Sequence, residues 1–177
     1  MGDFLLRAKH WQIFLVLSST HVIPWFVKDP VVVEFFVLLN SLLFFGWLAL
    51  LGNALYKSGS GFDYSLFWFL VDVFLLLLAV GISSIMDSDD FRITTSSFKA
   101  HNAGFLPMMY VLFAAVHAHW FVAAILVAIE QRETPTVSQY LGTFVLLFFW
   151  PIGIWFIQPR LNLIQEFSQA DDAHPLS

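Results

Sequence analysis

The chain has 177 residues, of which 59% are hydrophobic and only 12% are charged. A soluble domain is about 45–50% apolar and about 25% charged, so this composition excludes a water-soluble globular fold and suits a lipid environment. The net charge of −5, without any Lys/Arg cluster, leaves no basic face for nucleic acid. The absence of Cys excludes disulfides and thiolate metal sites.

Long hydrophobic runs predict an all-α integral membrane bundle. A hydrocarbon core of about 30 Å needs about 20 apolar helical residues. Barrel strands would alternate over about ten residues, whereas these runs are continuous and about twice as long. We expect one transmembrane domain over residues 1–177, with four spans and an N-terminal fifth left open. The expected helices are 11–27, 31–56, 65–86, 106–129 and 137–157, followed by a short acidic tail at 158–177.

Hydropathy and loop charge disagree about the first segment, residues 11–27. Cytoplasmic loops are richer in Lys and Arg. If all five segments cross, four cations lie on each side of the membrane. If the first segment lies in the interface, six cations face the cytoplasm and two face outward. The six are Arg7, Lys9, Lys28, Arg92, Lys99 and Arg160, and the two are Lys57 and Arg132. Hydropathy favours a fifth span, so the first segment stays open, and the C-terminus is expected in the cytoplasm.

Three motifs carry a resemblance to a known group of proteins. They are LRAKHWQIF over residues 6–14, FGW over 45–47 and WPIGIWFIQPRLN over 150–162. The chain resembles a group of small multi-spanning bacterial inner-membrane proteins that have no known activity. The resemblance implies a location in the bacterial cytoplasmic membrane and is compatible with five spans, but it supplies no reaction.

Asp72 is the first candidate for chemistry, because it lies about 10 Å inside the third segment. Ionisable groups in a bilayer are costly and are functional-site candidates by default. Asp72 shares a small, polar helical face with Ser65, Ala79 and Ser83. One interpretation is an ion or proton site, and the other is an interhelical hydrogen bond that locks the bundle.

Three histidines are further candidates. His117 and His119 lie about 200° apart on a helix, so they cannot both ligate one metal from it. The i, i+4 spacing of a zinc pair is missing. His21 follows three hydroxyl residues and reaches mid-membrane only if the first segment spans. Each is interpreted either as a functional group or as a hydrogen-bonded packing histidine. We expect no cofactor, with an intramembrane haem or metal site left as an alternative.

Asn40 is a polar bundle-core candidate in the second segment. Pro151 frees a backbone carbonyl and should kink the last segment, either as a gate hinge or as a static kink. Pro159 is expected at a helix end, with Arg160 extending to the headgroups. Glu130 is near a segment end and is expected to reach interfacial water.

No nucleophile elbow such as G-x-S-x-G is present, so the sequence shows no evident catalytic motif, and we lean against an enzyme. We expect an oligomeric channel, pore or transport element, or an accessory subunit of a membrane complex, embedded in the lipid bilayer. The internal repeats common in transporters are not evident, so a path would need a homo-oligomer. The alternatives are a His/Asp metal or haem redox protein and a membrane effector of a bacterial defence system.

Overall fold

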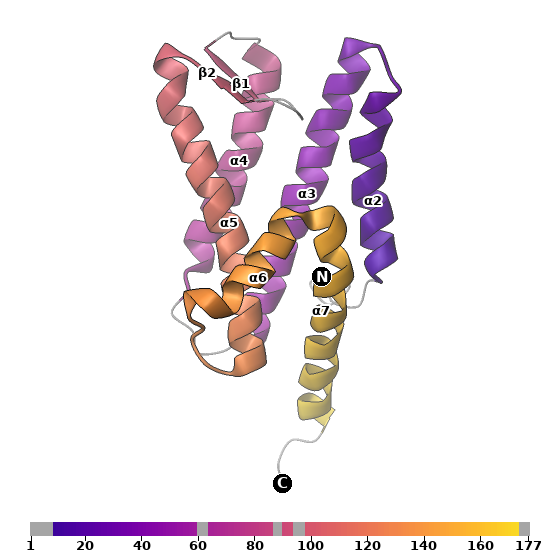
Figure 1. Cartoon of the computed structure of the whole chain (residues 1–177), viewed down its shortest axis with the longest axis vertical. Coiled ribbons are helices and arrows are strands. Elements are labelled where there is room, and N and C mark those ends of the chain that lie inside the picture. The colour runs from indigo at the N-terminus through magenta and orange to yellow at the C-terminus, as the bar shows by residue number, and fades with distance from the viewer. Residues whose placement is uncertain (1–8, 60–63, 87–89, 94–97, 174–177) are drawn as a thin grey trace. The chain divides into compact units, whose positions relative to one another are not determined.

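A computed structural model describes residues 9–59, 64–86, 90–93 and 98–173. This part of the chain is all-α, apart from one small antiparallel hairpin (Figure 1). The helices are α2 (His10–Val22), α3 (Pro30–Ser58), α4 (Leu66–Met86), α5 (Phe105–Gln131), α6 (Val137–Phe148) and α7 (Trp150–Ala173). Short 3-10 turns at Ile23–Trp25 and Asn102–Gly104 follow α2 and precede α5. The strands are β1 (Phe91–Ile93) and β2 (Phe98–Ala100), in a register that pairs Arg92 with Lys99.

Among the described residues, three helices are long and apolar enough to cross a membrane: α3, α4 and α5 with its preceding turn. Their bounds agree with the predicted segments 31–56, 65–86 and 106–129 to within two residues. The described first segment is shorter than predicted, because its α-helix stops at Val22 and a 3-10 turn containing Pro24 follows. Asp29 then starts α3, since its Oδ1 accepts the N–H groups of Val31 and Val32 at 2.9 and 3.2 Å.

The chain divides into two compact units. Unit 1 comprises Met1–Leu15, Leu50–Leu66 and His119–Ser177, and unit 2 comprises Val16–Ala49 and Phe67–Ala118. Helices α2, α3 and α5 therefore each contribute one end to unit 1 and the other to unit 2.

Unit 2 has its core along one face of α4. The buried side chains recur at helical spacing and are Phe69, Asp72, Val73, Leu76, Val80 and Ser83. Helix α5 presents a matching stripe, at Met108, Val111, Ala114 and Ala118. On the other side of α4, large apolar side chains such as Trp68 and Phe74 stay more than 60% exposed. Such a surface suits lipid rather than water.

Unit 1 has its core along the second half of α5, where every residue from 121 to 128 is buried. Leu147 of α6 and Ile154, Ile157 and Leu161 of α7 are buried as well, each at most 1% exposed. This part of α5 is buried all round, as expected for a central helix.

The prediction of one kinked helix over residues 137–157 is wrong for the fifth hydrophobic segment. It consists of two helices, separated at Phe149, whose φ of −93° and ψ of 54° are not helical. Pro151 is the second residue of α7, where a missing N–H leaves no hydrogen bond unmade. The break therefore precedes the proline, and Pro151 does not kink a continuous helix.

Helix α7 also continues past the predicted end at residue 157. Pro159 lies inside it, and the helix runs to Ala173 through residues expected as a tail. A proline in a helix removes one backbone hydrogen bond. Arg160, the next residue, is held by side chains of other helices, which keeps this part of α7 in place.

Candidate functional site

The candidate site is built around Asp72, which the buried stripe of α4 turns toward the core of unit 2. The residue is only 5% exposed and lies among Phe69, Val73 and Leu76. An isolated carboxylate in such surroundings would be very costly. Its stability there depends on its partners.

Both partners come from α5. The Tyr110 hydroxyl donates a hydrogen bond to Asp72 Oδ1 at 2.6 Å, and His117 Nδ1 lies 2.5 Å from Asp72 Oδ2. Tyr110 and His117 are seven residues apart, which places them on one face of the helix about 10 Å from each other along its axis. Each carboxylate oxygen therefore has its own partner, and the three groups form a continuous chain of hydrogen bonds.

His117 is the more accessible member of the pair. Its side chain is 23% exposed, against 7% for that of Asp72. Phe113, one helical turn earlier, stacks on the imidazole with ring centroids 5.8 Å apart and an interplanar angle of 4°. This stacking holds the ring in the plane from which Nδ1 meets the carboxylate.

The arrangement can hold a proton on either of two groups. With a proton on Nδ1, the imidazole donates to the carboxylate, and with a proton on Oδ2, the carboxyl donates to Nδ1. Histidine is the side chain best suited to such exchange near neutral pH. Charge-assisted hydrogen bonds of this kind are short and strong.

A cavity of about 650 Å³ lies beside the other end of this chain, also within unit 2. Its walls include Leu78 and Ile82 of α4, Pro107 and Tyr110 of α5, and Asp90. Tyr110 thus separates the cavity from Asp72. The tight backbone contact of Gly104 with Asp90 closes one side, since a Cβ at Gly104 would meet the Asp90 carbonyl oxygen at 1.9 Å.

Tyr110 is the member of the site that sequence reasoning missed. The sequence signal that could have revealed Tyr110 is its spacing of seven residues from His117, since positions i and i+7 share a helical face. A tyrosine in an apolar helix is ordinarily interpreted as an interfacial residue, which hid this relation.

Two other predicted polar residues serve packing in unit 2. Asn40 Oδ1 accepts a hydrogen bond from Thr20 Oγ1 at 3.0 Å, which joins α3 to α2. Ser83 Oγ accepts the backbone N–H of Ile93 at 2.6 Å, which fastens β1 to α4.

The remaining histidines lie elsewhere. His21 is half-buried and its ring faces that of Trp25 with centroids 6.0 Å apart. His119 belongs to unit 1, where it is 5% exposed and lies 5.3 Å from the ring of Phe148 on α6. His117 and His119 therefore contact different helices. Within the described ranges, no group of three or more His, Asp or Glu residues is placed to hold a metal ion.

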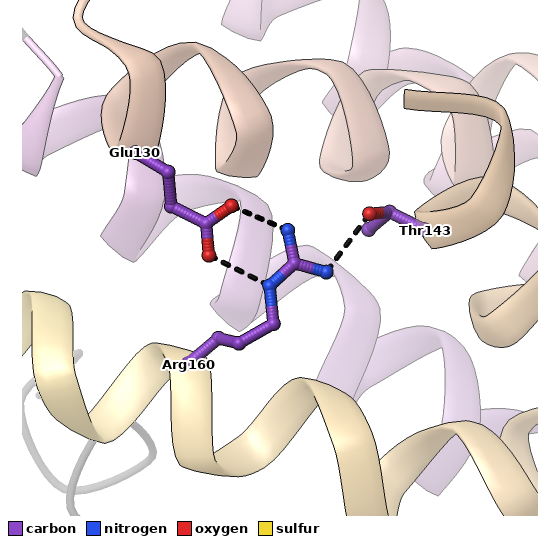
Figure 2. A network of polar contacts seen from close by, with 3 residues as sticks. All are labelled: Glu130, Thr143 and Arg160. Atoms are coloured by element: carbon purple, nitrogen blue, oxygen red, sulfur yellow. Dashed lines mark hydrogen bonds and ion pairs between the residues drawn. The ribbon is translucent and has the colours of Figure 1, made fainter. Parts of the chain in front are cut away.

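Unit 1 contains a second polar cluster, which we call the α7 clamp: Glu130, Thr143 and Arg160 (Figure 2). Arg160 Nε and Nη2 donate to the two oxygens of Glu130 at 2.6 and 2.5 Å, and Nη1 donates to Thr143 Oγ1 at 2.9 Å. The clamp joins α5, α6 and α7. Arg160 was expected to extend to headgroups and Glu130 to interfacial water, but their side chains meet each other and are about 30% exposed.

Comparison with known proteins adds no assignment, since no family model, curated protein or solved structure matches this chain.

Proposed function

We propose that this chain is a small polytopic membrane protein that transfers protons, with Tyr110, Asp72 and His117 as its proton relay. The observation that carries the proposal is the buried carboxylate of Asp72, hydrogen-bonded on each oxygen to a group that can itself bind or release a proton. Intramembrane chains of acidic groups and histidines are typical proton pathways.

The donor set favours a proton over a metal cation. A bare Ca²⁺ takes six to eight oxygen ligands, and Mg²⁺ needs a near-octahedral set. The cluster offers a single carboxylate, whose two oxygens are each already hydrogen-bonded to another side chain. A proton needs only one acceptor at a time, which Asp72 and His117 supply alternately.

The relay also has two distinct ends. His117 is partly exposed at one end, and Tyr110 lines the cavity at the other. A proton taken up by the imidazole can pass from Nδ1 to Asp72 Oδ2, and the other oxygen of the same carboxylate contacts the Tyr110 hydroxyl. The part of α5 between Tyr110 and His117 is about 10 Å long, about a third of a 30 Å hydrocarbon core.

The setting we propose is the bacterial cytoplasmic membrane, supported by the motifs at both chain ends and by three helices with the length and composition of spans. Since one relay between two helices is not a path through the whole bilayer, we propose a homo-oligomer or a larger membrane complex that completes it. The competing function is an accessory subunit, in which the same contacts only hold α4 and α5 together.

Proton flux into liposomes distinguishes the two functions. The purified protein, reconstituted with a pH-sensitive dye inside and driven by a potassium diffusion potential, should acidify the lumen faster than empty liposomes do. Asp72→Asn should reduce the protein-dependent rate about tenfold or more, which corresponds to a barrier higher by about 1.4 kcal/mol. Glu34→Gln is the matched control, because it removes an exposed carboxylate near the start of α3 and should leave the rate unchanged.

Wild-type flux no greater than that of empty liposomes would overturn the transport proposal for the isolated protein. A lower melting temperature in Asp72→Asn, together with absent wild-type flux, would establish the structural lock instead.

A further inference from the structure

The break at Phe149 divides the fifth hydrophobic segment into two arms that are each too short to span. Helix α6 has 12 residues, equivalent to about 18 Å, and α7 covers about 15 Å between Trp150 and Arg160. The hydrocarbon core is about 30 Å thick. One arm can enter a leaflet, but neither arm can cross the bilayer.

The two arms run antiparallel. A Cβ at Gly153 would lie 1.7 Å from the carbonyl oxygen of Leu146, and Arg160 bonds Thr143 at 2.9 Å. The first pair lies three and four residues from Phe149 and the second lies six and eleven residues from it, so the chain reverses at Phe149 and the arms approach most closely near this apex. Figure 1 shows α6 rising to this apex and α7 descending from it.

The turn itself leaves no polar group of Phe149 unpaired. Its N–H donates to Val145 at 2.9 Å, and its carbonyl accepts from Ile152 and Gly153 at 3.0 and 2.9 Å. Pro151 has no N–H to satisfy. Unpaired backbone groups are costly in the hydrocarbon region, and Phe149, the one non-helical residue of the turn, adds none.

The apex is strongly apolar on its outer side. Its large side chains are between 47% and 63% exposed: Phe148, Phe149, Ile152, Trp155 and Phe156. The opposite face of the hairpin is buried in unit 1, through Leu147, Ile154 and Ile157. The outer face is therefore an apolar surface of two short arms, with a length that matches one leaflet.

The base of the hairpin is polar and lies where α5 ends. Glu130 is one residue before the end of α5 and pairs with Arg160 at the foot of the descending arm. The loop that leads into α6 carries the exposed Glu133, and α7 continues beyond Arg160 with the exposed Glu166. Both feet of the hairpin are thus at the level of the same helix end.

We propose that α6 and the first half of α7 form a re-entrant hairpin, which enters one leaflet and leaves on the side from which it came, with its apex packed against lipid acyl chains. This proposal does not depend on proton transfer. It implies three full spans, α3 to α5, and a crossing by the first segment, because α2 and its following 3-10 turn together extend about 26 Å. Helix α2 begins beside the hairpin, with His10 and Phe14 packed against Trp155, so both termini lie on one side.

This topology also addresses the conflict between hydropathy and loop charge. The first segment crosses, as hydropathy favours, and the last one does not. The side with the termini then holds five cations and the other holds three. The five are Arg7, Lys9, Lys57, Arg132 and Arg160, and the three are Lys28, Arg92 and Lys99. The excess places both termini in the cytoplasm.

The absence of native Cys makes single-cysteine labelling a clean test. Glu133→Cys and Glu166→Cys lie at the two feet of the hairpin, and Phe149→Cys lies at its apex. Lys28→Cys and Lys57→Cys, at opposite ends of α3, are the sidedness controls. The variants are treated with a membrane-impermeant maleimide in spheroplasts and in inverted vesicles.

We expect Glu133→Cys, Glu166→Cys and Lys57→Cys to react in inverted vesicles, Lys28→Cys to react in spheroplasts, and Phe149→Cys to react in neither. Labelling of Glu133→Cys and Glu166→Cys from opposite sides would overturn the hairpin and restore a span. Labelling of Phe149→Cys as fast as Glu133→Cys would overturn its insertion. A nitroxide attached to Phe149→Cys should be relaxed by oxygen more than by a water-soluble nickel complex, and the reverse would also contradict lipid contact.

Discussion

Two polar clusters in the described part of the chain contain the same kind of contact in different surroundings. In unit 2, Asp72 meets His117 with side-chain exposures of 7% and 23%, and in unit 1, Glu130 meets Arg160 with exposures near 30%. Arginine stays protonated at any physiological pH, so the α7 clamp is a permanent ion pair. Histidine is not fixed in one charge state as arginine is, which is why we propose the buried pair, and not the clamp, as the proton relay. The cation, more than the carboxylate, distinguishes the permanent ion pair of the clamp from the proton relay that we propose.

The largest expected effect comes from replacing His117 by a cation that stays protonated. In His117→Arg the cation beside Asp72 can no longer release a proton, so proton flux into liposomes should fall about tenfold or more, as in Asp72→Asn. The ion pair survives in His117→Arg, and the melting temperature should therefore fall less than in Asp72→Asn. Unchanged flux in a correctly folded His117→Arg would show that exchange at residue 117 is not required.

The next effect concerns the hairpin above the clamp. Gly153→Ala places a methyl group against the Leu146 backbone, which cannot move as a flexible side chain could, so we expect a loss of about 1–3 kcal/mol. Gly142→Ala is the matched control on α6, because nothing lies within 4 Å of its added Cβ. Thermal unfolding in detergent should separate the two, and equal melting temperatures would contradict the close approach of the arms.

An effect of similar size is expected at the phenol end of the proposed relay. Tyr110→Phe removes one hydrogen bond to a buried carboxylate, a contact of about 1.5–3 kcal/mol when the acceptor is charged. Flux should fall less than in Asp72→Asn, because the contact with His117 remains. Parallel flux and melting measurements check this, and a flux loss as large as that of Asp72→Asn would make Tyr110 an obligatory carrier.

The smallest effect is expected when the arginine of the α7 clamp is replaced by a histidine, as in the buried pair. Arg160→His introduces a group whose unperturbed pKa is about 6.5, and Glu130 beside it should raise that pKa in the folded state. The pair then stabilises the fold below about pH 6.5 and is lost as pH rises through the folded-state pKa. For a pair about 30% exposed the effect is within about 1 kcal/mol, measurable as a melting temperature that falls with pH more than in the wild type.

Hydropathy was sufficient to locate three long helices, because helices that meet lipid must be apolar along their whole length. It also singled out Asp72 as an anomaly in an apolar run. It was not sufficient to place Tyr110, whose role depends on which face of α5 meets α4. The break at Phe149 was hidden for a related reason, since residues 137–157 are apolar throughout and composition does not reveal where a helix reverses.

The amino-acid sequence by itself determined the helical, lipid-compatible class of this protein and the few polar residues inside its apolar segments. The tertiary structure decided which of those residues meet. Asp72 lies 45 positions from His117, and Glu130 lies 30 positions from Arg160. Such distant contacts depend on how the helices pack. Packing brought Tyr110 and His117 to one carboxylate, and it gave Asn40 and Ser83 hydrogen bonds that join neighbouring elements. It also folded the last hydrophobic segment back on itself.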